Sequence, residues 1–123
     1  MRNDISTSMY MLNKPAERKK LYKLAKSKNL WEKRVSILAT FAFIQKKKEN
    51  KDTIAIAEIL LKDKHDLIHK AVGWMLREVG KRDILVLEKF IQKHYKDMPR
   101  TTLRYSIEKF EETKRKKYLL GKW

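Results

Sequence analysis

An arginine stands inside the apolar stripe of a predicted helix. The segment NLWEKRVSILATF spans residues 29–41 and has the periodicity of a helix, and a rotation of about 100° per residue places Arg34 between Phe41 and Leu38. A guanidinium that is buried without a partner costs several kcal/mol, so we expect a negative group to meet it. Two partners are open: Glu58, which interrupts the next apolar stripe, or a phosphate or substrate bound at a concave face.

A tryptophan with two cations beside it is the second candidate for chemistry. Trp74 lies at the edge of an apolar stripe, with Lys70 four residues before it and Arg77 three residues after it. Trp74 can be a core residue whose neighbouring charges are solvated. Alternatively, its π-face is offered to a nucleotide or a cationic base while the two cations bind phosphates.

Other kinds of site find little support in the sequence. The chain has no cysteine, so thiolate clusters and thiol nucleophiles are excluded. His65, His69 and His94 do not form a metal spacing with Asp63 or Asp66. Glycine-rich phosphate loops, serine triads and closely spaced catalytic carboxylates are absent too. We therefore expect no metal site.

The charge of the chain indicates a polyanionic partner. The sequence has 31 Lys and Arg residues against 15 Asp and Glu residues, which gives a formal net charge of +16. The clusters KKK at 46–48 and KRKK at 114–117 are typical of solvated helix ends, and in so basic a chain they can also follow a nucleic-acid backbone. No export signal and no run of about 18 apolar residues is visible. We expect a cytoplasmic protein without a membrane partner.

The elements that must position these residues are predicted to be helices. A chain of 123 residues with only 3 Gly and 2 Pro favours one all-α domain. Start signals are expected at Asn13, Asn29, Asp52 or Thr53, Asp66, Asp83 and Pro99, and a stop signal at Gly80. The predicted helices span 13–27, 29–48, 53–62, 66–80, 83–95 and 99–110, and a last short helix lies in the basic tail.

The alternate helices resemble one another. Aligning them brings Ser36, Gly73 and Ser106 into one column, as expected where helices pack closely. We predict a short HEAT-like solenoid, an α-α superhelix of three antiparallel hairpins over residues 13–110, with a binding surface on its concave face. Residues 1–12 form a lead-in, 111–123 a basic tail or capping helix, and the exposed N-terminal edge is a surface for self-association.

Three ordered motifs carry a family resemblance over roughly residues 20–110. They are LYKLAKSKNLWEKRVSILAT, DLIHKAVGWMLREVGKRD and MPRTTLRYSIEKF, and they resemble the AlkD-type DNA alkylation repair family, which are DNA glycosylases built from HEAT-like repeats. In that family an arginine and a tryptophan of these motifs line the DNA-binding groove, and they correspond to Arg34 and Trp74. Lys33 stands where the family commonly has arginine. With Lys70 and Arg77, these residues form the expected DNA site.

The resemblance implies excision of cationic N3- or N7-alkylated purines from duplex DNA, without a cofactor. Family members are about twice as long, so we expect this chain to be the C-terminal half, with Asp4 as a remnant of the catalytic carboxylate. Catalytic groups must be held firmly, and residues near a chain end seldom are, so we expect the isolated chain to release alkylated bases no faster than spontaneous loss. The alternative is a non-catalytic helical-repeat module that binds nucleic acid or an acidic protein.

Overall fold

The computed structural model describes residues 15–123, and every regular element in that range is an α-helix. The predicted all-α fold class is therefore confirmed. The lead-in, which contains Asp4, and the predicted start signal Asn13 lie outside the described residues. The helices are α2 (Pro15–Ala25), α3 (Leu30–Leu38), α4 (Phe41–Lys47), α5 (Lys51–Leu60), α6 (Asp66–Arg82), α7 (Ile84–His94), α8 (Arg100–Ser106) and α9 (Glu112–Leu119).

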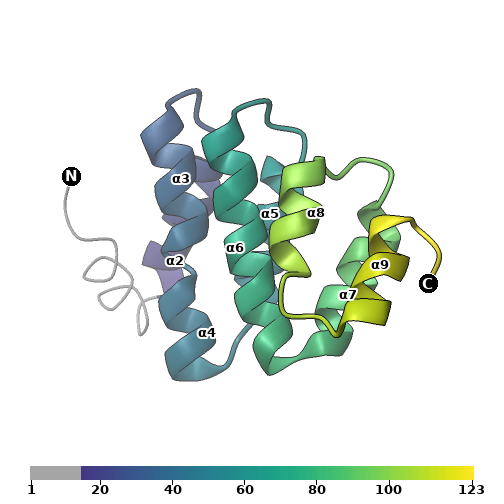
Figure 1. Ribbon diagram of the computed structural model, residues 1–123. Helices are drawn as coiled ribbons and strands as arrows, with labels where there is room; N and C mark the ends of the chain where they lie inside the picture. The colour runs from purple at the N-terminus through teal and green to yellow at the C-terminus, as the bar shows by residue number, and fades with distance from the viewer. Residues whose placement is uncertain (1–14) are drawn as a thin grey trace.

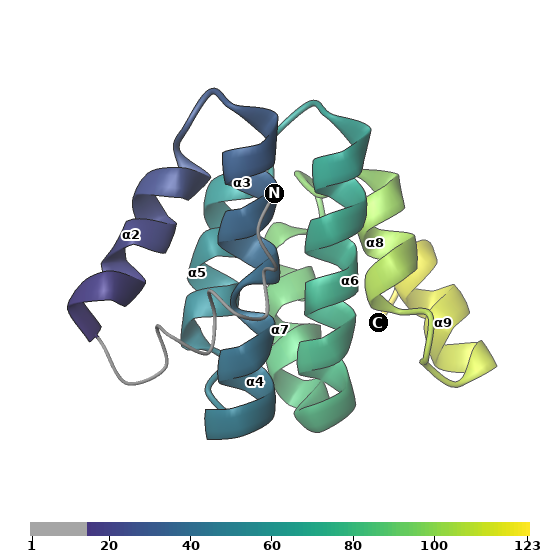
Figure 2. The ribbon, with the colours of Figure 1, turned by 90° about the vertical axis from the view of Figure 1, so that its left-hand side faces the viewer.

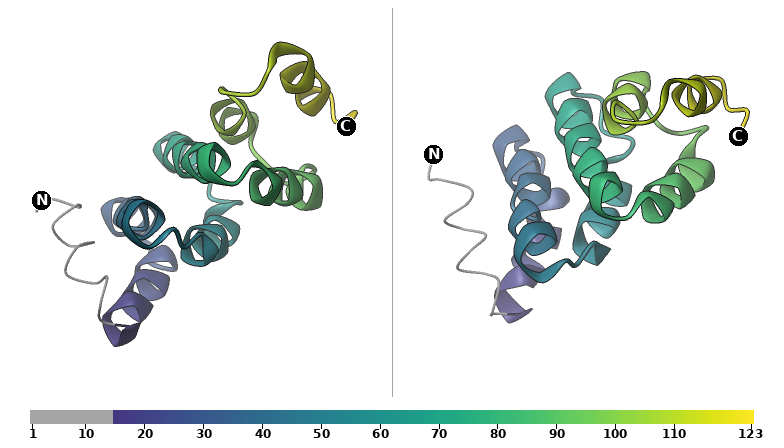
Figure 3. Two further views of the ribbon diagram at one scale, coloured as in Figure 1. Left: turned by 90° about the horizontal axis from the view of Figure 1, so that it is seen from below. Right: turned by 60° about the horizontal axis from the view of Figure 1, so that its bottom comes forward.

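The helices form two layers (Figures 1 and 2). The front layer contains α3, its continuation α4, α6 and α8, and the back layer contains α2, α5 and α7. Figure 3 shows the two rows nearly end-on, with α9 beyond α7 and α8. Helix α6 packs against α3, α5, α7 and α8, so it is the central element of the stack.

The space between the layers is filled by apolar side chains from every helix. These side chains recur three or four residues apart, so each helix turns one stripe inward. The most deeply buried large side chains include Leu21, Ile37, Phe43, Ile56, Met75, Leu87, Leu103 and Ile107. Within residues 15–123, no helix is long and apolar enough to cross a membrane.

The single helix predicted over 29–48 is in fact two helices, α3 and α4. At the break, Thr40 donates a backbone hydrogen bond to the carbonyl of Ile37 only three residues back (3.2 Å), and its hydroxyl donates to the same carbonyl (2.6 Å). A threonine hydroxyl that competes for a helical carbonyl in this way bends a helix. The break leaves α3 and α4 in the same layer but divides the arginine-bearing helix after Leu38.

Two of the predicted helix caps are confirmed. Asn29 accepts a hydrogen bond from the backbone N–H of Glu32 (3.0 Å), and Asp83 accepts one from that of Val86 (3.4 Å). Pro99 directly precedes α8, and its fixed φ is compatible with the start of a helix.

The other boundaries differ from the prediction for local reasons. His65 rather than Asp66 caps α6, since its Nδ1 accepts from the backbone N–H of Leu67. Gly80 does not end α6, which continues to Arg82. Helix α5 begins at Lys51 rather than at Asp52, whose carboxylate turns toward α2 and meets the Arg18 guanidinium.

The end of the chain also departs in part from the prediction. Helix α8 ends at Ser106 instead of at residue 110. The Ser106 hydroxyl donates a hydrogen bond to the carbonyl of Leu103 (2.8 Å). The basic tail forms helix α9, as expected. The Tyr118 hydroxyl holds α9 against α7 by donating to Glu88 (2.7 Å).

Small residues let the front-layer helices approach one another. Ser36 and Ser106 are fully buried, and a Cβ added at Gly73 would come within 2.6 Å of the Cβ of Tyr105 and 3.0 Å of the carbonyl oxygen of Thr102. The Thr102 hydroxyl in turn donates to the carbonyl of His69 (2.9 Å). The predicted close packing at this column is therefore present between α6 and α8.

Candidate functional site

A surface cleft of about 270 Å³ is lined by residues of three front-layer helices, α3, α6 and α8. Four of the five described residues that the sequence predicted for the site line this cleft. The lining residues are Arg34, Leu67, Lys70, Ala71, Trp74, Arg77 and Tyr105. We refer to this set as the α6 cleft, because five of its seven residues belong to that helix.

Arg34 lies in the α6 cleft without a carboxylate partner. The buried pair with Glu58 is not formed, because Glu58 instead accepts hydrogen bonds from His94 (2.7 Å) and Lys93 (3.3 Å), between α5 and α7. Among residues 15–123, no carboxylate lies within ion-pairing distance of Arg34. Its guanidinium carbon is 5.9 Å from the ring centre of Trp31, a cation–π contact with an exposed indole.

Trp74 is 38% exposed, so it is not the fully buried core residue of the alternative interpretation. Its ring lies 6.3 Å from that of Phe41, which supports one side of the indole. Because the rest of the ring borders the α6 cleft, an aromatic surface is available to a bound group.

Each of the two cations beside Trp74 forms an ion pair, Lys70 within α6 and Arg77 with a residue beyond α8. Lys70 pairs with Asp66 on the same helix (3.1 Å), and the hydrogen bond and charge of Asp66 raise the pKa of Lys70, with a smaller effect from Tyr105. Arg77 pairs with Glu108, which follows α8. The Nε of Arg77 is buried and has no hydrogen-bond partner in the part of the chain that the structure describes.

Lys33 does not reach the α6 cleft. Its ammonium pairs with Asp63 (2.5 Å) in the α5–α6 connection, and both side chains are largely buried. Burial opposes ionisation of Asp63, but hydrogen bonds from Lys33 and from the backbone of His65 lower the pKa of that carboxyl overall. Lys33 therefore connects α3 to the loop before α6, and the structure does not bring it together with the other predicted site residues.

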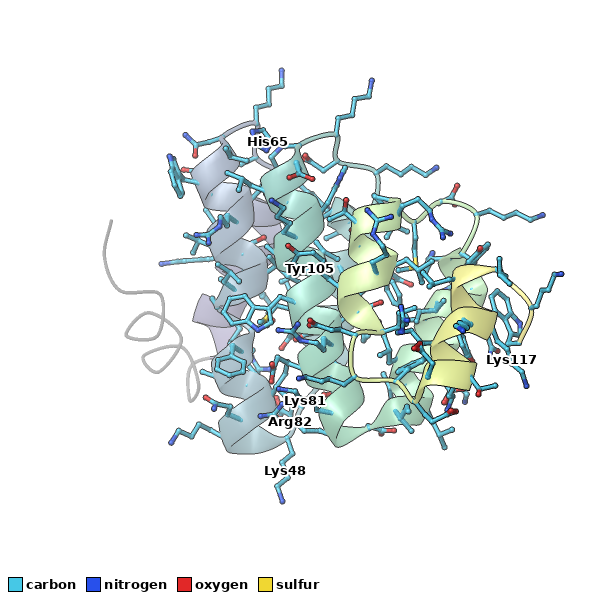
Figure 4. All side chains as sticks on the ribbon, in the orientation of Figure 1. Lys48, His65, Lys81, Arg82, Tyr105 and Lys117 are labelled. Carbon is cyan, nitrogen blue, oxygen red and sulfur yellow. The ribbon has the colours of Figure 1, made fainter. Side chains whose placement is uncertain are left out.

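Tyr105 is a cleft residue that the sequence interpretation did not select. It lies on α8, one residue before the buried Ser106, and Figure 4 shows it between α6 and α8 on the front of the molecule. The sequence contained one indication of this role: Tyr105 lies beside the apolar stripe of its helix rather than within it. Tyr105 is 38% exposed.

Neither a carboxylate nor a free histidine is placed for catalysis in the described part of the α6 cleft. No carboxylate lines the cleft in the described residues, and Asp4 lies outside them. His65 caps α6, and the ring of His69 hydrogen-bonds the carbonyl of Asp63 (2.5 Å). Between residues 15 and 123 no group of three or more such side chains is placed to hold a metal ion.

The comparison with protein families agrees with the resemblance of the three motifs. Residues 4–110 match the family model of the DNA alkylation repair enzyme. No curated protein and no solved structure gives a match. Because the family model covers most of the chain, this protein belongs to the DNA alkylation repair enzyme family.

Proposed function

We propose that the protein binds duplex DNA at the α6 cleft and acts in the repair of alkylated DNA. The observation that carries this proposal is the convergence of Arg34, Lys70 and Arg77 around the exposed indole of Trp74. Arg34 has no carboxylate partner among the described residues, so its charge is available to a phosphate. A planar guanidinium binds phosphate oxygens in a bidentate geometry that a lysine does not offer.

The net charge of +16 extends this argument to the whole molecule. A strongly basic protein attracts DNA over long distances and releases counterions when its cations meet phosphates. Such contacts orient the duplex but do not recognise a base. Selectivity for a lesion therefore has to come from the groups around Trp74.

The lesion class that suits Trp74 is a purine alkylated at N3 or N7. Such a base is positively charged, and a cation placed over an aromatic face gains free energy. The charged base is also a good leaving group, so that excision requires stabilisation of a positively charged sugar and a water molecule. A carboxylate is the natural group for both tasks, and the family resemblance assigns it to Asp4.

Salt dependence of DNA binding tests this proposal. If about five phosphates are neutralised, the logarithm of affinity falls with the logarithm of salt concentration at a slope of about −4 to −5. Arg34→Ala should weaken binding by about 1–3 kcal/mol and reduce the slope by about one. Lys93→Ala is the control, because it removes the same charge from α7 in the back layer.

Two results count against the proposal. Binding that does not respond to salt, or no binding at low salt, excludes phosphate contacts as its basis. Equal losses in Arg34→Ala and Lys93→Ala would mean that only net charge matters and that the α6 cleft is not the site.

A second candidate function is DNA binding without base excision. It is favoured by one observation: no carboxylate lines the α6 cleft in the described residues. Release of free base from duplex DNA that contains 7-methylguanine distinguishes the two functions. From this chain alone we expect no release above the protein-free control, and DNA binding without release supports the second candidate. Release above that control that is lost in Asp4→Asn would instead support the glycosylase.

A further inference from the structure

The hydroxyl of Tyr105 differs from the other tyrosine hydroxyls of the described chain. Three of these hydroxyls hydrogen-bond to the protein, at O···O distances of 2.5–2.9 Å. The acceptors are Asp52 for Tyr22, the carbonyl of Leu119 for Tyr95 and Glu88 for Tyr118. Within residues 15–123 the Tyr105 hydroxyl has no hydrogen-bond partner, although the ring stands beside four cleft residues that the sequence selected.

The position of Tyr105 is fixed by the contact between α6 and α8. The Cβ of Tyr105 is seated against Gly73, where even a methyl group would come within 2.6 Å of it. One turn of helix earlier, Thr102 hydrogen-bonds α8 to the carbonyl of His69 on α6 (2.9 Å). A side chain with two rotatable bonds on so closely packed a backbone loses little entropy when it binds a ligand.

We propose that the Tyr105 hydroxyl donates a hydrogen bond to a phosphate oxygen of the DNA strand held by Arg34 and Lys70. This inference rests on the proposed function and adds a neutral binding residue to its cations. Lys70 and Tyr105 both line the α6 cleft, one from α6 and the other from α8, so both side chains face the space that a bound strand would occupy. A tyrosine presents an apolar ring to the cleft and a polar tip to the ligand, which suits a site that also contains Leu67 and Ala71.

A neutral donor has a thermodynamic signature that a cation does not share. Loss of a lysine or an arginine that contacts a phosphate weakens binding and also reduces the number of counterions released. Loss of a hydroxyl removes a hydrogen bond but changes no charge. The affinity falls while the slope of its salt dependence stays the same.

Tyr105→Phe tests the inference, because phenylalanine keeps the ring and its packing. We expect its affinity for duplex DNA to fall about 3- to 10-fold with an unchanged salt slope. Tyr95→Phe is the matched control: it also removes one hydroxyl, but that hydroxyl donates to the carbonyl of Leu119 at the end of α9, and we expect no change in affinity. Arg34→Ala in the same titration should show both a lower affinity and a reduced slope.

The possible failures are distinguishable. If Tyr105→Phe binds as tightly as the unaltered protein while Arg34→Ala binds more weakly, the role of the hydroxyl is refuted and the proposed DNA site stands. Equal losses in Tyr105→Phe and Tyr95→Phe would also refute it, since the effect would not be local to the cleft. If the unaltered protein shows no salt-dependent binding, the proposed function itself fails.

Discussion

Single side chains of the α6 cleft differ in how their charges are compensated. Arg34 has no carboxylate partner in the described residues, and Lys70 forms an exposed pair with Asp66. Arg77 is more buried, and its partner Glu108 is more than half exposed. The carboxylate of Glu108 thus occupies a position on Arg77 that a DNA phosphate would take in the proposed complex.

Glu108→Gln is predicted to raise the affinity for duplex DNA by about 2- to 5-fold. The neutral amide competes less with phosphate for Arg77, and an exposed ion pair contributes no more than about 1 kcal/mol. Equilibrium binding at one fixed salt concentration measures the gain. Glu112→Gln removes the same charge on α9, where Glu112 pairs with Arg115, and it should have a smaller effect. Equal gains in both variants would assign the effect to net charge alone.

The cleft residues on one helix were predictable, and the partners across helices were not. Trp74, Lys70 and Arg77 share a face through their spacing of three and four residues, which the sequence contains. The pairing of Lys33 with Asp63 joins residues 30 positions apart, so it depends on how α3 meets the loop before α6. The same limit explains why the sequence left the Arg34–Glu58 pair open, although Glu58 in fact pairs with His94 and Lys93.

At the scale of elements, the contact between α6 and α8 determines the geometry of the cleft. Helix α6 depends on Gly73 there, because Thr102 and Tyr105 of α8 lie directly against it, and the alignment of alternate helices predicted a small residue at this position. The break between α3 and α4 was not predictable, because the apolar periodicity continues through it. Two hydrogen bonds mark the break, since both the backbone N–H and the hydroxyl of Thr40 donate to the carbonyl of Ile37.

Gly73→Ala is predicted to lower the free energy of unfolding by about 1–2 kcal/mol. Alanine favours the helix by about 1 kcal/mol, but its Cβ would collide with the Cβ of Tyr105 and the carbonyl oxygen of Thr102, which cannot move independently. Urea denaturation measures the loss. Gly80→Ala meets the flexible end of Leu87 instead, so its loss should be smaller. A Gly73→Ala protein of unchanged stability would contradict this packing.

The link between α5 and α7 is predicted to weaken in acid. Hydrogen bonding from His94, and with smaller effect Lys93, lowers the pKa of Glu58 below its ordinary value of 4.5. In the range around and below pH 4.5 the unfolded chain binds more protons at this site, so stability from Glu58 is present above that pH and lost as pH falls further. The side chain is partly exposed, and the contribution is therefore a few tenths of a kcal/mol.

Urea denaturation of Glu58→Gln at pH 6 and pH 3.5 measures this contribution. The variant should be slightly less stable than the unaltered protein at pH 6, and the difference should diminish at pH 3.5. A difference that is the same at both pH values would show that the charge of Glu58 does not stabilise the fold.

At the scale of the whole molecule, the two layers carry different features. The front layer carries the α6 cleft, whereas α5 and α7 in the back layer are joined by Glu58 and its partners. Composition alone predicted an all-helical and strongly basic chain. Composition could not predict which face carries the candidate site, since that follows from how the helices stack.

The three tryptophans provide a direct test of the proposed DNA-binding face. Trp74 borders the α6 cleft, Trp31 lies on α3 beside Arg34, and Trp123 stacks on Tyr118 of α9 with ring centres 5.3 Å apart. Each indole N–H gives its own signal in a ¹⁵N-labelled sample. On titration with duplex DNA, we predict that the signal of Trp74 shifts most and that of Trp123 stays in place. A shift of Trp123 with Trp74 unchanged would contradict the assignment of the α6 cleft as the DNA-binding site.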